Sequence, residues 1–232
     1  MTTNDGSENL EPALKRLAVM DASLGEKLAG LADVTREGQP DFVGAVDRMV
    51  ARLRKTDAGE SAPRPGEPMP PFHLPDHEGR IVSLEELLAK GPVAVTFLGG
   101  HWCGYCRINL NALVCAQAEI TAEGGQVVAI MPDRQPFASE LRSAEKVPFP
   151  ILTDMDNGYA LSLGLAVWLG AEMQQMMEGV QDLPRFQGNN LWMCPITATF
   201  VVGKNGLVKA RFVDPDFRAR MAISDLVAAL RS

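Results

Sequence analysis

The chain contains 232 residues, of which 46% are hydrophobic and 22% are charged, a composition typical of a globular protein and not of a disordered polymer. Its 29 acidic residues outnumber 22 basic ones, and the formal net charge of −7 argues against a nucleic acid or an anionic membrane as a partner. The longest apolar runs fall far short of the ~20 residues of a membrane helix. Because residues 1–8 also lack the features of a signal peptide, we expect a cytoplasmic protein.

Residues 1–56 are predicted to form a helical arm. Leu10, Leu14 and Leu17 recur every three or four residues, and a similar spacing continues along the arm. Asp41 is a candidate N-cap for a further helix. The apolar stripe of such an arm must be buried against the main domain or against a second subunit, and the pattern favours neither.

Residues 57–71 are rich in proline, glycine and small polar residues and predict a semi-extended linker. The remaining domain, residues 72–232, alternates predicted strands and helices, beginning with a helix whose first turn carries a Ser83–Glu86 capping box. Strands are expected near 92–98, 126–131, 149–153, 197–202 and 207–213, and Met-rich helical segments over 158–179. An Asn-Gly turn joins the last two strands. This order predicts an α/β domain with a central mixed sheet flanked by helices.

The chain contains four cysteines, two of which, Cys103 and Cys106, form a CxxC motif between a predicted buried strand and a helix. Free N–H groups and the helix dipole stabilise a thiolate at such a helix start. We therefore expect Cys103 to be the more exposed thiol with the lower pKa, and Cys106 to attack a mixed disulfide formed there. Cys115 is expected in the core. Oxidation is expected to join Cys103 to Cys106 within one chain.

Two other interpretations of the motif remain open from the residues alone. A zinc site would need further ligands, and only His101, Cys115 and Cys194 are candidates. The two cysteines could also be inert core residues, although a CxxC beside a strand–helix–strand pattern favours a redox motif. We favour thiol–disulfide redox chemistry.

Residues around the motif resemble the thioredoxin superfamily. Trp102 precedes the CxxC, and a segment containing Pro195 and Thr197 precedes the predicted hairpin. The resemblance implies a thioredoxin-like fold with an N-terminal helical extension, a cis peptide bond at Pro195, and substrate contacts from Trp102, Pro195 and Thr197. His101 is a candidate to accept or relay the proton of the nucleophile, or else a solvated turn residue. Cys194 either resolves an oxidised cysteine or fills an apolar slot.

Longer segments are similar to the alkyl hydroperoxide reductase/thiol-specific antioxidant group, in its peroxiredoxin-like form with a Trp-Cys-x-Tyr-Cys motif. The matching segments are 66–76, 149–154, 198–202 and 212–217. The resemblance implies an oxidoreductase that reduces peroxides or disulfides with no metal or organic cofactor, because the cysteines carry the electrons. It also implies a thioredoxin- or glutaredoxin-type reductant and a homodimer as a candidate assembly.

The motif departs from the peroxiredoxin pattern Pro-x-x-x-Thr-x-x-Cys. Superposed on it, Cys106 takes the peroxidatic place, Cys103 the threonine and Gly99 the proline, and the arginine of the family falls on Thr197. We therefore expect slow peroxide reduction unless another guanidinium enters the site. The candidates are Arg107, Arg134 and Arg185. A protein disulfide reductase, and a redox sensor or metal-binding module without turnover, are the alternative functions.

Overall fold

The computed structural model describes residues 10–231 of the chain. Residues 1–9 and Ser232 lie outside the described residues. They include the start of the predicted arm and residues 1–8, on which the expectation about a signal peptide rests.

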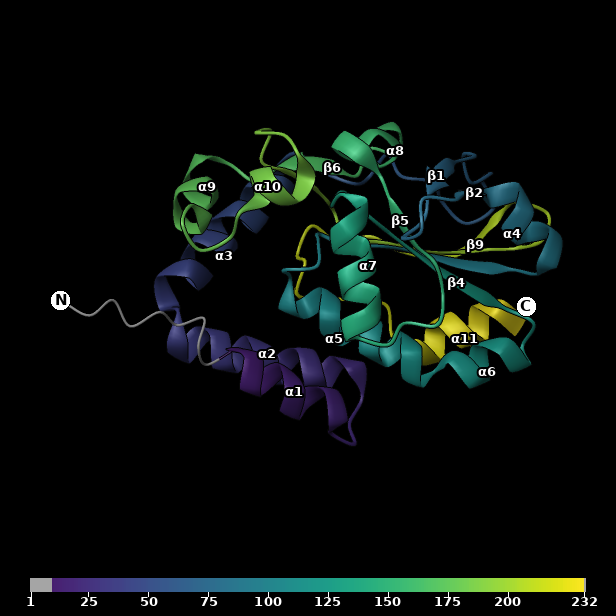
Figure 1. The fold of residues 1–232 in the computed structure, drawn as a ribbon, viewed down its shortest axis with the longest axis horizontal. Coiled ribbons are helices and arrows are strands. Elements are labelled where there is room, and N and C mark those ends of the chain that lie inside the picture. Colours follow the sequence, from purple (N-terminus) through teal and green to yellow (C-terminus); the bar gives the residue numbers. More distant parts are fainter. Residues whose placement is uncertain (1–9, 232) are drawn as a thin grey trace.

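The centre of the described chain is a sheet of five strands: β3 (Val93–Phe97), β4 (Gln126–Met131), β5 (Ile151–Thr153), β8 (Thr199–Val202) and β9 (Val208–Phe212). Their order is β5-β4-β3-β8-β9 (Figure 1). β3, β4 and β5 run parallel, whereas β8 pairs antiparallel with β3 and β9 pairs antiparallel with β8. The sheet is therefore mixed, as the sequence predicts.

Helices cover both faces of the sheet, which explains the continuous apolar run of its central strand. Val95 and Phe97 of β3 face a hydrophobic cluster that includes residues of α4 (Leu84–Lys90) and α8 (Gly158–Ser162). Ala94 faces the opposite cluster, which holds side chains of α5 (Gly104–Cys115), α6 (Gln117–Ala122), α7 (Gln135–Ala144) and α11 (Ile223–Arg231). Alternate residues of a strand thus point into two separate cores.

A two-stranded hairpin, β1 (His73–Pro75) and β2 (Ile81–Ser83), leads into α4. The predicted capping box is present at its start. The Glu86 N–H donates to Ser83 Oγ at 3.1 Å, and the Ser83 N–H donates to Glu86 Oε2 at 3.3 Å.

Residues 158–179 contain helical segments, as predicted, but also a strand that the sequence analysis did not predict. A short strand, β6 (Ala166–Trp168), separates α8 from α9 (Ala171–Met177) and pairs antiparallel with β7 (Met193–Pro195). Gly164 follows α8 with a φ of +71°, a left-handed conformation that ends a right-handed helix, and Gly170, with a φ of +97°, is the N-cap of α9. The other short elements are the 3-10 helix Met155–Asn157 and α10 (Leu183–Gln187).

The N-terminal arm consists of α1 (Leu10–Val19), α2 (Leu24–Gly38) and α3 (Pro40–Lys55), and it packs on its own domain. Leu14, Leu17 and Leu31 belong to the same buried cluster as α5, while α3 packs against α9. The predicted N-cap at Asp41 is wrong, because α3 begins one residue earlier, at a proline that is favoured in the first helical turn.

Residues 57–71 follow the arm in a series of turns that lie against the β8–β9 hairpin. The Arg211 guanidinium donates to the carbonyl oxygens of Ala62 and Pro63, and the Met69 N–H donates to the Gly206 carbonyl at 2.9 Å. These contacts fix the path of the chain between the arm and β1.

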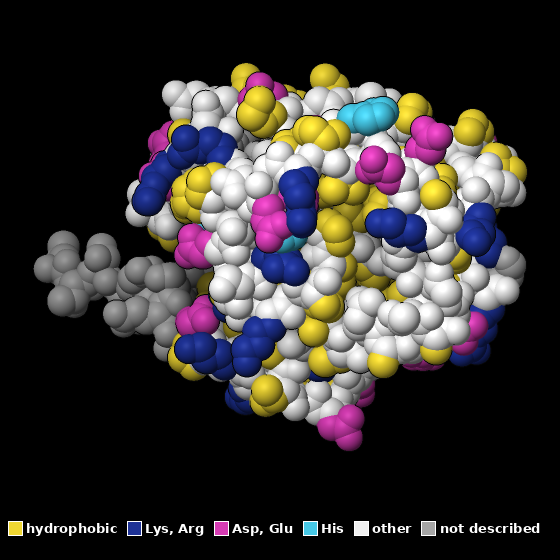
Figure 2. Space-filling view, turned by 45° about the vertical axis from the view of Figure 1, so that its right-hand side comes forward, with side chains coloured by type: hydrophobic (Ala, Val, Ile, Leu, Met, Phe, Trp, Pro, Cys, Tyr) yellow, Lys and Arg dark blue, Asp and Glu magenta, His cyan; other side chains and the backbone are white. Residues whose placement is uncertain are grey.

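Acidic and basic side chains are interspersed on the face of the molecule that Figure 2 shows. Within residues 10–231, no helix combines the length and the hydropathy that a transmembrane span requires.

Candidate active site

The CxxC motif lies where β3 ends and α5 begins. Cys103 is the N-cap of α5, and its Sγ accepts a hydrogen bond from the Cys106 N–H at 3.4 Å. Cys106 lies in the first turn of the helix and is fully buried, whereas Cys103 is 5% exposed. All four cysteines are reduced.

Three groups surround the sulfur of Cys106. The Gly99 N–H donates to it at 3.3 Å, Arg220 Nη2 at 3.5 Å, and the Cys103 thiol through a further hydrogen bond. Burial raises the pKa of Cys106, but these hydrogen bonds and the charge of Arg220 outweigh it and lower the pKa to about 6. Cys106 is therefore the thiolate of the pair.

Cys103 has the opposite electrostatic balance. Its hydrogen bond to Cys106 and its burial raise its pKa well above the usual value, and the charge of Arg220 opposes this only in part. The expectation that Cys103 has the lower pKa is thus wrong, although its greater exposure is confirmed. The reason is that the cation and the Gly99 donor contact the sulfur of Cys106.

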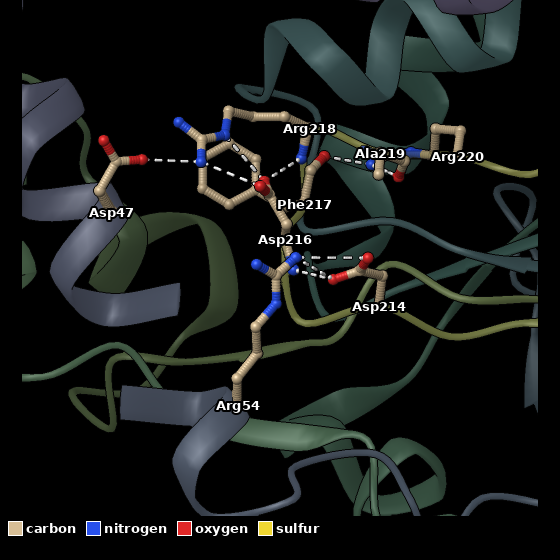
Figure 3. A network of polar contacts seen from close by, with 8 residues as sticks. All are labelled: Asp47, Arg54, Asp214, Asp216, Phe217, Arg218, Ala219 and Arg220. Atoms are coloured by element: carbon tan, nitrogen blue, oxygen red, sulfur yellow. Dashed lines mark hydrogen bonds and ion pairs between the residues drawn. The ribbon is translucent and has the colours of Figure 1, made fainter. Parts of the chain in front are cut away.

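Arg220, which the sequence analysis missed, comes from the segment between β9 and α11. Its side chain is 9% exposed, and its Nη1 donates to the carbonyl oxygens of Phe217 and Ala219 (Figure 3). The three arginines named as candidates lie elsewhere: Arg107 pairs with Glu11 and Glu145, Arg134 donates to the Arg185 carbonyl, and Arg185 lies over the Phe137 ring. No local sequence pattern distinguishes Arg220 from these.

Two hollows reach Cys103. One is a small apolar cavity of about 60 Å³, which Cys103 lines together with three of the predicted site residues, Trp102, Pro195 and Thr197. The other is an open groove of about 710 Å³ between the arm and the segment after α9, which Cys103 and Trp102 also line. Of the two motif cysteines, Cys106 lines neither hollow.

His101 does not join this group. Its Nδ1 lies 2.8 Å from Asp133 Oδ2, and its ring stacks on that of Phe137 with 5.0 Å between centroids. The side chain is 17% exposed, so it is also not a solvated turn residue. His101 fixes the loop before Cys103, because its backbone N–H donates to the same carboxylate oxygen.

The cis peptide bond expected at Pro195 is not present, since the described residues contain none. Pro195 ends β7 opposite Ala166, and the trans form satisfies this pairing. A trans bond before proline is also favoured by about 0.5–1 kcal/mol.

The two remaining cysteines differ in burial. Cys194 is buried and lines the small cavity, with its Sγ 3.8 Å from the Gly99 carbonyl oxygen, and burial raises its pKa. Cys115 is exposed, so its predicted place in the core is wrong. It is the last residue of α5, beyond the buried stripe that ends with Leu113. In the described chain, no third His, Cys, Asp or Glu completes a metal-binding cluster with any of these thiols.

Comparison with known proteins places this geometry in a family. The family model of AhpC/TSA matches residues 65–211. The chain belongs to the AhpC/TSA family. Membership makes it an oxidoreductase of the thiol-dependent, peroxide-reducing and antioxidant kind, as the sequence resemblance implies.

Two relatives illustrate the match. A Mycobacterium tuberculosis protein that carries the peroxiredoxin name is 28% identical over 146 residues, or 62% of this chain and 81% of the relative. The chloroplastic peroxiredoxin Q of Sedum lineare is 32% identical over 107 residues, or 46% of this chain and 56% of the relative.

Solved structures share the predicted thioredoxin-like fold. Peroxidoxin BcpB from Mycobacterium tuberculosis superposes with a TM-score of 0.57 at 20% identity, covering 73% of this chain and 97% of that one. A cysteine-to-serine mutant of peroxiredoxin 6 from Arenicola marina gives a TM-score of 0.55 at 14% identity, covering 72% of this chain and 71% of that one.

Proposed function

We propose that Cys106 is the nucleophile that attacks peroxides and that Cys103 resolves the oxidised product. The observation that carries this proposal is the contact of Arg220 Nη2 with Cys106 Sγ at 3.5 Å, supported by the Gly99 N–H at 3.3 Å. The superposition on the peroxiredoxin motif puts Gly99 where those enzymes have proline, which has no N–H to donate. Gly99 and Arg220 thus supply a donor and a cation from positions of their own.

In the first step the Cys106 thiolate attacks one oxygen of the peroxide. The O–O bond breaks and an S–O bond forms, which leaves a sulfenic acid on Cys106 and an alkoxide or hydroxide. The thiol proton of Cys103 neutralises this leaving group and yields an alcohol or water. The small cavity lined by Gly99 and Cys103 is the proposed entry for the peroxide. Because Cys106 is fully buried and does not line this cavity, the attack requires a local opening there.

In the second step the new Cys103 thiolate attacks the sulfur of Cys106. A disulfide forms, and hydroxide leaves and takes up a proton to become water. The overall reaction converts one peroxide and two thiols into one disulfide, one alcohol or water, and one further water.

We propose that a thioredoxin-type dithiol then reduces the disulfide by attack on Cys103. Of the two cysteines, Cys103 lines the open groove, and Cys106 is the better leaving group because its pKa is lowered to about 6. The peroxide and the reductant would therefore react with different sulfurs of the same pair.

Stopped-flow mixing of the reduced protein with hydrogen peroxide tests this order. We expect the wild type to form the Cys103–Cys106 disulfide, the Cys103→Ser variant to stop at a sulfenic acid on Cys106, and the Cys106→Ser variant to lose the fast phase. A fast phase that persists in Cys106→Ser would refute the assignment. Faster turnover with disulfide substrates than with peroxide would instead favour the disulfide reductase.

We keep the cytoplasm as the proposed location, because a dithiol that is reduced in each cycle needs a reducing compartment. A homodimer stays a prediction that light scattering would check. The division into an arm (1–56), a linker (57–71) and a main domain (72–232) is likewise a proposal, which limited proteolysis would test.

A further inference from the structure

We infer that the N-terminal arm holds Arg220 against Cys106, with Asp47 and Arg54 of α3 acting as positioning residues. The arm does so through ion pairs with the segment 213–220, which we call the arginine segment. This inference rests on the proposed function, because it concerns the guanidinium beside the proposed nucleophile.

Two ion pairs connect α3 to the arginine segment (Figure 3). Asp47 Oδ1 lies 2.8 Å from Arg218 Nη2, and Arg54 Nη2 lies 3.1 Å from Asp214 Oδ1. The segment joins these two contacts internally, since Arg218 also pairs with Asp216 at 2.8 Å and the Asp216 N–H donates to Asp214 Oδ1. A shift of α3 would therefore move the whole network.

The network continues from Arg218 to the guanidinium of Arg220. Arg220 is held by the carbonyl oxygens of Phe217 and Ala219, which are the backbone neighbours of Arg218 on either side. The Phe217 ring packs edge-on against Tyr105 of α5, with 5.5 Å between centroids, and against the buried cluster of α3. The arm thus fixes the backbone from which Arg220 reaches Cys106.

The arginine segment is held by its own turns, by the packing of Phe217 and by the ion pairs from the arm. It lies between the end of β9 and the start of α11, with no helix or strand of its own. Arg220 Nε is buried without a hydrogen-bond partner in the described structure, and a buried cation is costly unless its surroundings hold it. Besides the carbonyl oxygens of Phe217 and Ala219, the ion pairs from α3 are contacts that hold the backbone behind this guanidinium.

The arm lies before the residues that the family model matches, and the arginine segment lies after them. That match covers residues 65–211, so it includes both motif cysteines and excludes α3 and Arg220. The arginine of the family pattern is replaced by Thr197, which lies within the match. Thr197 supplies no cation, and the guanidinium that contacts Cys106 is that of Arg220.

Asp47 and Arg54 act on Cys106 only through Arg220. The charged and titratable groups that face the Cys106 sulfur are Arg220 from the arginine segment, Cys103 from the start of α5 and Cys194 from β7. A readout at Cys106 therefore reports the position of Arg220 when the ion pairs are removed.

The test is the pH dependence of Cys106 alkylation, followed by mass mapping, in the full-length Asp47→Asn/Arg54→Gln variant. We expect the midpoint to rise towards that of an ordinary thiol and the alkylation rate near neutral pH to fall about 3- to 5-fold, as two partly exposed ion pairs would allow. The Asp47→Glu/Arg54→Lys variant keeps both charges and should retain the wild-type midpoint.

The matched control is Arg48→Gln, which removes another ion pair of α3, the one with Glu172 at 2.6 Å. It should leave the midpoint unchanged. An unchanged midpoint in Asp47→Asn/Arg54→Gln, together with a raised one in Arg220→Gln, would overturn the inference and leave the proposed function intact. Because alkylation needs no peroxide, a failure of peroxide reduction alone would refute the function and not this inference.

Discussion

Arg220 is the cation that contacts the sulfur of Cys106, at 3.5 Å. We expect Arg220→Gln to slow the reaction of Cys106 with hydrogen peroxide by about 10²-fold, the loss typical for a preorganised donor next to developing charge. Stopped-flow oxidation under single-turnover conditions measures this. Arg134→Gln serves as the control, because Arg134 donates to the Arg185 carbonyl instead of the dithiol. Equal rates in the two variants would contradict the role of Arg220.

The lowered pKa of Cys106 gives its reactivity a defined pH dependence. The thiolate reacts and the thiol does not, so alkylation should accelerate as the pH rises through about 6 and level off above it. Cys103 should stay unreactive over the same range, since its pKa is raised well above the usual value. A midpoint at Cys103 below that at Cys106 would show that the proton lies on the other sulfur.

Cys103 stands where the peroxiredoxin pattern has a threonine, and its thiol donates to Cys106. We expect Cys103→Ser to keep the low midpoint of Cys106 alkylation, because a hydroxyl can donate the same hydrogen bond. Cys103→Ala should raise that midpoint, since no donor remains. The rate of Cys106 alkylation is measured against pH in both variants. Identical midpoints would show that the hydrogen bond from Cys103 does not lower the pKa of Cys106.

The sequence correctly predicted that both thiols lie at the start of a helix, but it predicted the opposite order of their pKa values, for a physical reason. The CxxC spacing and the helix start are local, and they indicate two thiols in one turn. Which thiol ionises depends on Arg220, which lies 114 residues after Cys106 along the chain. No pattern around Arg220 marks it as a partner of the motif.

At the level of helices, α2 shows how the arm and the helix that carries the CxxC motif share one core. Leu31 is 2% exposed and belongs to the cluster that contains Cys103 and Cys106. Leu31→Ala should lower the free energy of unfolding by about 2–5 kcal/mol, as for other buried leucines. Urea denaturation measures it, with Val19→Ala as the control because Val19 is 85% exposed. Equal stability of the two variants would mean that the arm does not contribute to the core.

Most helices and strands could be read from periodicity, and the exceptions have identifiable causes. Nearly continuous apolar runs predict β3 and β4, because both faces of these strands are buried. Apolar residues every three or four positions predict the arm, because one stripe of each helix is buried. The strand β6 escaped prediction because it has three residues and depends on pairing with β7, far along the chain. The surface that the arm covers is likewise set by tertiary packing, and the spacing of apolar residues shows only which face of a helix is buried.

For the molecule as a whole, oxidation should produce a closed monomer. The motif cysteines lie within one helical turn, whereas Cys115 is exposed at the far end of the same helix. We expect the oxidised protein to run as a monomer on non-reducing gels and to lose two hydrogens by mass spectrometry. Cys115→Ser should behave identically. A covalent dimer that disappears in Cys115→Ser would show that the main route runs between chains.

The groups that lower the pKa of Cys106 also affect how easily the oxidised pair is reduced. With its pKa near 6, Cys106 is mostly ionised at pH 7 in the dithiol form, which favours that form about tenfold over one with an ordinary thiol. The raised pKa of Cys103 hardly changes the preference for the dithiol form, since an ordinary thiol is already protonated at pH 7. A tenfold preference corresponds to a reduction potential about 30 mV more positive. The hydrogen bonds from Cys103 and Gly99 and the charge of Arg220 therefore together make the disulfide a stronger oxidant, and the contacts that favour attack on peroxide also favour return to the dithiol.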